Sequence, residues 1–293
     1  MKYFYYPGCI AETSAAEADI ATREVARALD IELIESPASS CCGAGNLARV
    51  NPLLDLITNA RNISLAEKER ADIVTICNTC LLTLKNARDK FMKNPDMKTR
   101  TNSVLSGINA KYQGDVDIKH FLWVIVKDLG LASLKKRVQN PLTGLKIAPF
   151  YGCQILRPSE IMQFENPDDP QSLENLITTL GGIPVQHEGR TKCCGFPLFL
   201  VNRQASLKML SLRFQEIKEK GADCIVTPCT LCHLALDTLQ NDAWWIAPRG
   251  RRFELPVFHV SQLTAMALGV DIKKLEFERH FVNVKSIMKR IRD

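Results

Sequence analysis

The sequence lacks three features, and each absence excludes a class of protein. No apolar run approaches the roughly 20 residues of a membrane-spanning helix, since even the segment from His120 to Val126 is followed by Lys127 and Asp128. The amino terminus has no succession of charged, apolar and small residues typical of a secretory signal, so we expect a cytoplasmic protein. Charge of one sign is not in large excess, because 38 Lys and Arg oppose 32 Asp and Glu. Nucleic acid is therefore not an expected partner.

The composition is that of a folded protein with sizeable cores. Hydrophobic residues make up 46% and charged residues 24% of the 293 positions, and the mean hydropathy is −0.07. These values exclude disordered, collagen-like and fibrous chains, and the length favours two domains of roughly 150 residues. There are eleven cysteines. In a reducing compartment, such a number favours metal ligands or redox groups over disulfides.

Ten of the eleven cysteines form two sets of five that recur in the same order. The recurring segments are Tyr6-Pro7-Gly8-Cys9 with Phe150-Tyr151-Gly152-Cys153, Ser40-Cys41-Cys42-Gly43 with Lys192-Cys193-Cys194-Gly195, and Cys77-Asn78-Thr79-Cys80 with Cys229-Thr230-Leu231-Cys232. The paired cysteines and the Cys-x-x-Cys motifs are each 152 positions apart (193 − 41 and 229 − 77), but the first cysteines only 144 (153 − 9). Eight extra residues therefore lie early in the second copy, where 166–170 supply a loop. We expect two pseudo-symmetric domains, 1–143 and 144–293.

Each half alternates β-rich segments with segments of helical periodicity. In the first half we expect strands at 2–6, 31–34 and 73–76, and helices at 14–29, 53–70 and 81–91. Such alternation indicates an α/β fold, with a small, mostly parallel sheet and flanking helices in each domain. Residues 93–114, rich in Lys, Asn, Ser and Gly, are predicted to be a polar excursion, and 139–145 are predicted to be the linker.

The placement of the cysteines indicates metal binding. All five of each set lie at the ends of predicted strands or in the turns that follow, and in a parallel sheet those turns gather at one edge, where ligands bind. Thiolates are soft ligands that select iron–sulfur clusters, zinc or Cu(I). A structural zinc would use four ligands and leave one thiolate unused, whereas adjacent cysteines differ from the spaced ligands of ordinary cubane clusters. Zinc stays open at this point, and an iron–sulfur cluster of unusual shape is favoured.

The doubled pattern resembles the CCG domain. This domain occurs twice in the B-type subunit of heterodisulfide reductase and in related subunits of thiol:fumarate reductase, archaeal-type succinate dehydrogenases, and glycolate or lactate oxidases. The resemblance implies two non-cubane [4Fe-4S] clusters, one for each set. The implied ligands are Cys9, Cys41, Cys42, Cys77 and Cys80 for the first cluster, and Cys153, Cys193, Cys194, Cys229 and Cys232 for the second.

The resemblance also implies an activity and partners. It predicts an oxidoreductase component that cleaves or forms a disulfide between two facing clusters, with electrons from a C-like iron–sulfur protein and an A-like flavin protein of the same complex. The substrate would be a small anionic disulfide, thiol or persulfide. Gly43 stands where the methanogen members of the family have Pro, which favours a different sulfur substrate, as in sulfur-oxidising complexes. The alternative is an electron-transfer or anchoring subunit of a thiol:fumarate reductase, succinate dehydrogenase or sulfur-oxidising complex.

Several residues outside the two sets are weaker candidates. His233, directly after Cys232, is a candidate proton donor, and a surface histidine at the start of a helix is the alternative. His120 and His259 are expected to end strands in the core rather than bind metal. Cys224 is expected to be a buried packing residue. Lys192 would favour an anionic substrate or simply be an exposed lysine.

Two basic segments are candidate interaction surfaces. Arg249, Arg251 and Arg252 follow Trp244-Trp245 and form either a partner or anion surface or a solvated loop. From Phe277 to Ile291, apolar residues recur at helical spacing with basic residues between them, which predicts an amphipathic helix. It would dock a partner subunit, make peripheral membrane contact, or pack on the second domain.

Overall fold

The first half of the chain builds a sheet of short strands separated by helices. In the computed structural model, which describes residues 1–246 and 252–292, its elements are β1 (Lys2–Tyr6), α1 (Ala16–Ala28), β2 (Glu32–Ile34), α2 (Asn46–Val50), α3 (Pro52–Glu69), β3 (Ile73–Thr75), α4 (Asn78–Lys93), α5 (Pro95–Ser106), β4 (Ile118–His120), α6 (Phe121–Trp123), the π-helical turn η1 (Val124–Gly130) and α7 (Leu131–Lys135). The long helix α3 begins where the Asn51 side chain accepts a hydrogen bond from Leu54 N at 3.0 Å and Pro52 occupies the first turn.

The second half repeats this order. Its elements are β5 (Lys146–Pro149), α8 (Ser159–Met162), α9 (Ser172–Thr179), β6 (Ile183–Pro184), η2 (Glu188–Thr191), α10 (Phe196–Phe199), α11 (Arg203–Glu219), β7 (Cys224–Thr227), α12 (Thr230–Thr238), α13 (Gln240–Ile246), β8 (Val257–His259), α14 (Val260–Ala267), η3 (Ile272–Lys274), η4 (Phe277–Arg279) and α15 (Lys285–Arg292). Helix α11 starts like α3, with the Asn202 side chain accepting from Ala205 N at 3.0 Å.

The two sheets have the same topology. Their strand orders are β2-β1-β3-β4 and β6-β5-β7-β8, and every neighbouring pair is parallel. The inner strands β3 and β7 are buried along their whole length, because helices cover both faces of a parallel sheet. The predicted α/β class with two pseudo-symmetric domains of CCG type is confirmed.

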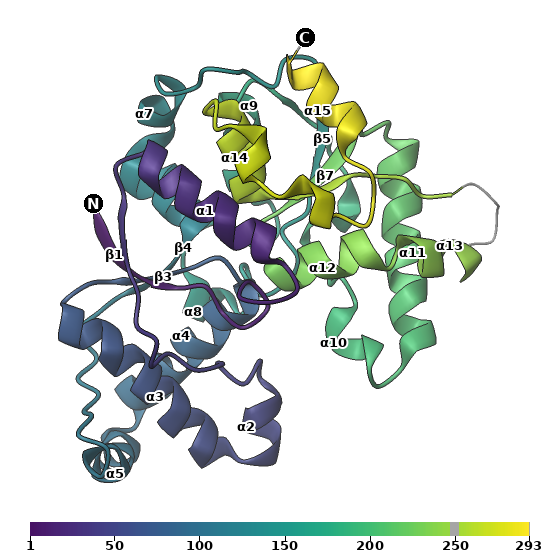
Figure 1. Cartoon of the computed structure of the whole chain (residues 1–293). Coiled ribbons are helices and arrows are strands. Elements are labelled where there is room, and N and C mark those ends of the chain that lie inside the picture. Colours follow the sequence, from purple (N-terminus) through teal and green to yellow (C-terminus); the bar gives the residue numbers. More distant parts are fainter. Residues whose placement is uncertain (247–251, 293) are drawn as a thin grey trace.

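Helices of each half pack against helices of the other half (Figure 1). Helix α1 of the first half packs on α14 of the second, and α9 of the second half packs on α6 and α7 of the first. At the α1–α14 contact, the fully buried hydroxyl of Thr22 donates to Ser261 Oγ at 2.7 Å. Each half therefore covers part of the other half's core.

Two local predictions are wrong. The predicted polar excursion contains helix α5, which starts at Pro95 after the Asn94 side chain accepts from Met97 N at 3.1 Å. Only Thr101 and Leu105 of this helix are buried, so its polar composition concealed its periodicity. The helix after the first Cys-x-x-Cys starts at Asn78 rather than 81, which places the second cysteine of the motif inside the first helical turn.

The predicted carboxyl-terminal helix is shorter than expected. Only α15 is α-helical, and Phe277 begins a separate 3-10 turn. Between them the backbone is held by Asp237, whose carboxylate accepts from Phe281 N at 2.8 Å and Val282 N at 3.1 Å. The Phe281 side chain is 76% exposed, so it does not share the apolar face that the spacing predicted. Val284 and Ile287 are buried, each with 3% of its surface exposed.

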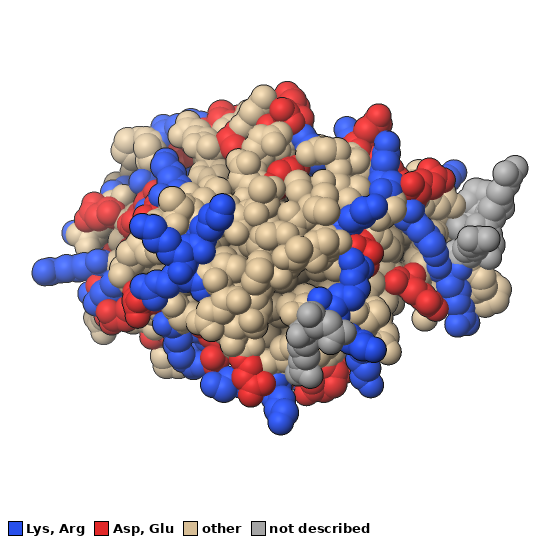
Figure 2. All heavy atoms as spheres, turned by 90° about the horizontal axis from the view of Figure 1, so that it is seen from above, with Lys and Arg blue, Asp and Glu red and all other residues tan. Residues whose placement is uncertain are grey.

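The surface seen from above carries charges mainly at its margins. Figure 2 shows a broad central area of uncharged residues, bordered by Lys and Arg together with Asp and Glu. Both signs are interspersed at this border, so this face has no continuous basic surface. Within residues 1–246 and 252–292, none of the helices combines the length and the apolar character needed to cross a bilayer.

Candidate metal centres

The two cysteine sets follow the carboxyl ends of the strands and meet at the boundary between the halves, where His259 contacts the carbonyls of Ile76 and Pro228. Cys9 follows β1 and Cys77 follows β3, whereas Cys80 lies in the first turn of α4. The same arrangement recurs in the second half. All eleven cysteines are free thiols. The predicted gathering of strand ends at one edge is thus realised twice, with the two edges facing each other.

The first set combines exposed and buried thiols. Cys9 Sγ lies 3.5 Å from Cys41 Sγ, and Cys42 Sγ lies 3.5 Å from Cys80 Sγ. Cys9 and Cys41 are exposed, and the other three are buried. The backbone N–H of Gly43 donates to Cys41 Sγ at 3.4 Å. A hydrogen bond of this kind stabilises negative charge on sulfur.

The second set is more deeply covered. Cys153 and Cys193 are half-buried, and Cys194, Cys229 and Cys232 are buried. The thiol of Cys193 lies near those of Cys153 and Cys194, and Cys194 lies near Cys232, close enough for these thiols to shift one another's pKa. The backbone N–H of residue 195 donates to Cys193 Sγ at 3.3 Å, as its counterpart does in the first half.

Two glycines allow the backbone to approach the thiols. Gly8 has φ +84°, and a Cβ there would lie 2.7 Å from Cys80 Sγ. Gly152 has φ +71°, and a Cβ there would lie 3.0 Å from Cys232 Sγ. A residue with a side chain would be strained in this conformation and would collide with the sulfur. The glycine before the first cysteine of each set therefore makes room for the last.

The two sets touch at the boundary between the halves. The thiols of Cys77 and Cys229 lie close enough for each to shift the pKa of the other. Next to them, Asn78 Nδ2 donates to the carbonyl oxygen of Tyr151 at 2.8 Å, and Thr79 Oγ1 donates to Gln154 Oε1.

A cavity of ≈ 20 Å³ lies at this boundary. It is lined by Asn78 and Thr79 of the first half and by Cys153, Gln154, Cys193, Cys194, Pro197, Cys229, Leu231 and Cys232 of the second. Apart from the cysteines, no residue of this lining is ionisable. Sequence reasoning missed Asn78, Thr79 and Gln154 as site residues. Their positions directly beside cysteines of the motifs were the available signal.

One thiol of each adjacent cysteine pair favours the anionic form. Hydrogen bonds from Cys41 and Cys80 lower the pKa of Cys42 to about 4 against the cost of burial. Hydrogen bonds from Cys153 and Cys194 lower the pKa of Cys193 to about 2. The thiolate is the form that binds metals. In the described part of the chain, no three or more His, Cys, Asp or Glu side chains surround a position for a single metal ion.

The histidines have structural contacts. His120 and His259 end β4 and β8 and are fully buried, as predicted. The Nε2 atom of His259 lies 3.2 Å from Ile76 O and 3.0 Å from Pro228 O, the two carbonyls that precede Cys77 and Cys229. Burial lowers the pKa of His120 to about 3 and that of His259 to about 4.

His233 is not a surface histidine. It is 1% exposed, and its Nε2 atom lies 2.8 Å from Glu17 Oε1 of the first half. It is not among the residues that line the cavity. The pKa of Glu17 is nevertheless lowered, because the hydrogen bond and charge of His233 outweigh the large opposing cost of burial. His233 thus links the two halves through its contact with Glu17.

The remaining candidates are placed as follows. Cys224 is fully buried in β7, and burial raises the pKa of its thiol, which confirms its packing role. Lys192 is exposed. Arg249 and Arg251 lie outside the described residues. Arg252 is exposed, and its guanidinium lies 5.6 Å from the ring centroid of Trp244.

Comparison with known proteins agrees with this architecture. The sequence profile of the CCG family, described as a cysteine-rich domain, matches residues 3–85 and 147–237. A solved structure of a hypothetical protein from Helicobacter pylori superposes with a TM-score of 0.76 at 16% identity and covers 97% of this chain. The chain spans about half of that structure, 52% of its length. This likeness shows a shared fold.

Curated relatives match over almost the full length. The chain is 36% identical over 286 residues to the 8-methylmenaquinol:fumarate reductase membrane anchor subunit of Wolinella succinogenes, with 98% of this chain and 99% of the relative covered. It is 32% identical to a protein of Archaeoglobus profundus named as similar to the B subunit of heterodisulfide reductase (94% and 93% covered). It is 31% identical to the B subunit of the ferredoxin/F420H2-dependent CoB-CoM heterodisulfide reductase of Methanosarcina acetivorans (98% and 96% covered). With two matched copies of the cysteine-rich domain and these relatives, the chain belongs to the family of heterodisulfide reductase B subunits, which are CCG proteins.

Proposed function

We propose that this chain is the iron–sulfur catalytic subunit of a heterodisulfide reductase-type complex. In this proposal each cysteine set holds one non-cubane [4Fe-4S] cluster. The ligands would be Cys9, Cys41, Cys42, Cys77 and Cys80 for the first cluster, and Cys153, Cys193, Cys194, Cys229 and Cys232 for the second. The observation that carries the proposal is the convergence of both sets at one boundary, where His259 Nε2 contacts the carbonyls that precede Cys77 and Cys229.

The surroundings of the thiols fit such a group. Ten soft donors in two sets select iron and sulfide over hard cations. Each set has a backbone N–H within 3.4 Å of a cysteine sulfur and a glycine that leaves room for the sulfur of its last cysteine. Hydrogen bonds to sulfur and solvent exposure are features by which proteins adjust iron–sulfur centres.

The residues at the boundary would position the substrate. When bound, the two clusters would supply single electrons, of which a disulfide requires two. Thr79 and Gln154 present hydrogen-bonding groups from opposite halves, and Asn78 fixes their relative position through Tyr151. Lys192, exposed beside Cys193, supplies a positive charge for a small anionic disulfide, thiol or persulfide.

The proposal includes partner proteins. Two relatives from Methanosarcina species are named as B subunits of ferredoxin-linked CoB-CoM heterodisulfide reductases. We propose that an iron–sulfur protein of the C type and a flavin protein of the A type deliver or accept the electrons. The exposed side of the first set, at Cys9 and Cys41, is accessible to such a partner.

A second candidate function is supported by the relative from Wolinella succinogenes. At 36% identity it bears the name of a membrane anchor subunit of an 8-methylmenaquinol:fumarate reductase. In this alternative the chain transfers electrons or anchors a fumarate reductase or dehydrogenase, in which a quinol donates the electrons and no disulfide is reduced.

Metal content and activity test the proposal separately. We expect anaerobically purified protein to contain roughly eight irons with matching acid-labile sulfide and little zinc. Cys42→Ala or Cys194→Ala should each lose about half of the iron. With a dye as electron partner, reduction of a disulfide or oxidation of a thiol supports the first function. Intact clusters that exchange electrons with a quinol and with no thiol–disulfide pair would support the second.

A further inference from the structure

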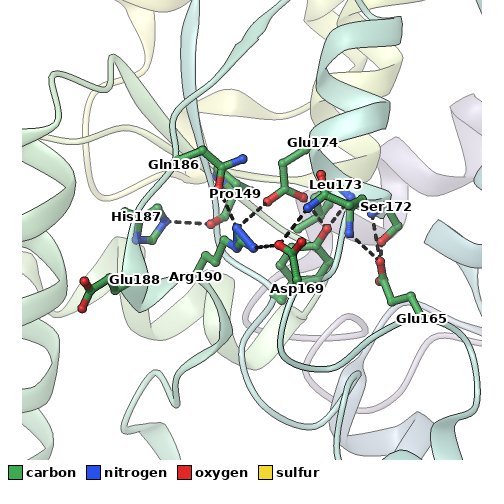
Figure 3. A network of polar contacts seen from close by, with 12 residues as sticks. Pro149, Glu165, Asp169, Ser172, Leu173, Glu174, Gln186, His187, Glu188 and Arg190 are labelled. Carbon is green, nitrogen blue, oxygen red and sulfur yellow. Dashed lines mark hydrogen bonds and ion pairs between the residues drawn. The ribbon is translucent and has the colours of Figure 1, made fainter.

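An ionic network borders the second cysteine set, and Arg190 is at its centre (Figure 3). Arg190 lies in the turn η2, three residues before Cys193, and its side chain is only 11% exposed. Its guanidinium lies 2.6 Å from Asp169 Oδ1, 2.6 Å from Gln186 Oε1 and 3.4 Å from Glu174 Oε1. Such a buried guanidinium fixes several groups at once, because its donors have a rigid planar geometry.

The same network reaches the loop before Cys153. The carbonyl oxygen of Arg190 accepts a hydrogen bond from Tyr151 N at 2.8 Å. The hydroxyl of Tyr151 donates to Glu174 and accepts from Leu173 N at 2.8 Å. The turn that leads into Cys193 and the loop that leads into Cys153 are therefore joined through Arg190 and its carboxylate partner.

A second contact joins the same two segments. His187, which is 5% exposed, lies with its Nε2 atom 2.8 Å from the carbonyl oxygen of Pro149. The backbone N–H groups of Glu188 and Gly189 donate to the carboxylate of Glu216 on α11. The turn before the adjacent cysteines is thus held from both sides.

The eight extra residues of the second half contribute to this network. Asp169 belongs to the loop 166–170 that the first half lacks, and Glu165, just before it, accepts hydrogen bonds from the backbone N–H groups of Gln171 and Ser172. Another ion pair of the same loop, Asp168 with Arg157 at 2.6 Å, lies at the surface. The insertion therefore supplies the carboxylate that pairs with Arg190.

The first half holds its adjacent cysteines differently. By the constant offset of 152, Ala38 stands where the second half has Arg190 (190 − 152). Ser40 is held there by neutral groups: its N–H donates to Asn62 Oδ1 at 3.0 Å, and its carbonyl accepts from Tyr6 Oη at 2.5 Å. The outer cysteines of this half, Cys9 and Cys41, are exposed, whereas those of the second half are only half-exposed.

We propose that Arg190 is a positioning residue for the second metal centre. Together with Asp169 and Glu174 it holds the loops of Cys153 and Cys193 in register, so the second centre retains its metal longer than the first. The inference rests on the proposed function, because it requires that both sets bind metal. It adds that the two centres are unequal, and that the insertion in the second half causes the difference.

Chelation with residue-level mapping tests this proposal. The anaerobic holoprotein is challenged with an iron chelator, samples are alkylated with iodoacetamide over time, and each cysteine is followed by peptide mass spectrometry. In the wild type, Cys9 and Cys41 should be alkylated before Cys153 and Cys193. Arg190→Gln should speed alkylation of the second pair about 10-fold or more, as loss of a group that orients metal ligands typically does, and leave the first pair unchanged.

Two matched variants distinguish loss of the Arg190–Asp169 ion pair from a general destabilisation of the fold. Asp169→Asn removes the negative charge of the exposed partner of Arg190. Asp168→Asn removes the negative charge one position earlier in the same loop, which pairs with Arg157 instead. We expect Asp169→Asn to release metal from the second cysteine set faster than the wild type, and Asp168→Asn to release it at the wild-type rate.

Three results would overturn the inference. Equal rates for both aspartate variants, or equal acceleration of both cysteine sets by Arg190→Gln, would show that Arg190 has no specific positioning role. Loss of metal from the second set first in the wild type would reverse the proposed order. Protein purified without iron would instead overturn the proposed function, so the two failures are distinguishable.

Discussion

The buried histidines predict a measurable loss of stability in mild acid. Burial lowers the pKa of His259 from 6.5 to about 4, so the folded protein keeps this ring neutral at a pH where the unfolded chain protonates it. Between pH 6.5 and 4 the unfolded state binds more protons, and stability therefore falls as the pH falls. From pH 7 to pH 5, a group with these two pKa values contributes a loss of about 2 kcal/mol.

The variant His259→Gln isolates this contribution. It retains a side-chain amide near the carbonyls of Ile76 and Pro228 but cannot titrate. Urea unfolding, followed by tryptophan fluorescence in anaerobic buffer at pH 7 and pH 5, should show a wild-type loss that exceeds the variant's by about 2 kcal/mol. Constant visible absorbance of the folded baseline at both pH values controls for acid damage to metal centres. Identical losses in both proteins would refute the reasoning.

Three further predictions concern the site and the core. Gly8→Ala should greatly reduce the iron bound by the first set, because the new Cβ would lie 2.7 Å from Cys80 Sγ. Gly144→Ala is the control: this position has φ +73° and open space around it, so unfolding experiments should show only the backbone strain of about 1–2 kcal/mol. Asn78→Ala removes a buried hydrogen bond between the halves, so urea unfolding should show a loss of about 1–3 kcal/mol. Phe4→Ala, at a fully buried position of β1, should cost about 3–5 kcal/mol, and a loss below about 1 kcal/mol would contradict its place in the core.

The sequence allowed prediction of features that depend on spacing. The repeated cysteines indicated two equivalent halves, and the alternation of β-rich and helical segments indicated parallel sheets. Helix α5 was missed because its sequence is polar and only Thr101 and Leu105 are buried. The length of the last helix was overestimated because periodicity alone cannot show that Asp237 captures the backbone of Phe281 and interrupts the helix.

Contacts between the halves were beyond the reach of sequence patterns. His233 was assigned to either a proton donor or the surface, because nothing in the sequence near it identifies Glu17, 216 positions away, as its partner. The same holds for Thr79 and Gln154, which meet only because the two sheet edges face each other. Such pairs depend on how complete domains pack, and this is set by many side chains together.

The packing of helices across the boundary between the halves indicates how the chain arose. Because α1 rests on α14 while α9 rests on α6 and α7, a protein made of one half alone would leave both of these faces open to water. A second copy of the same half, related by a twofold axis, would close both faces with the same contacts. The architecture therefore points to a homodimeric ancestor whose gene was duplicated and fused, after which each copy was free to diverge around its own five cysteines.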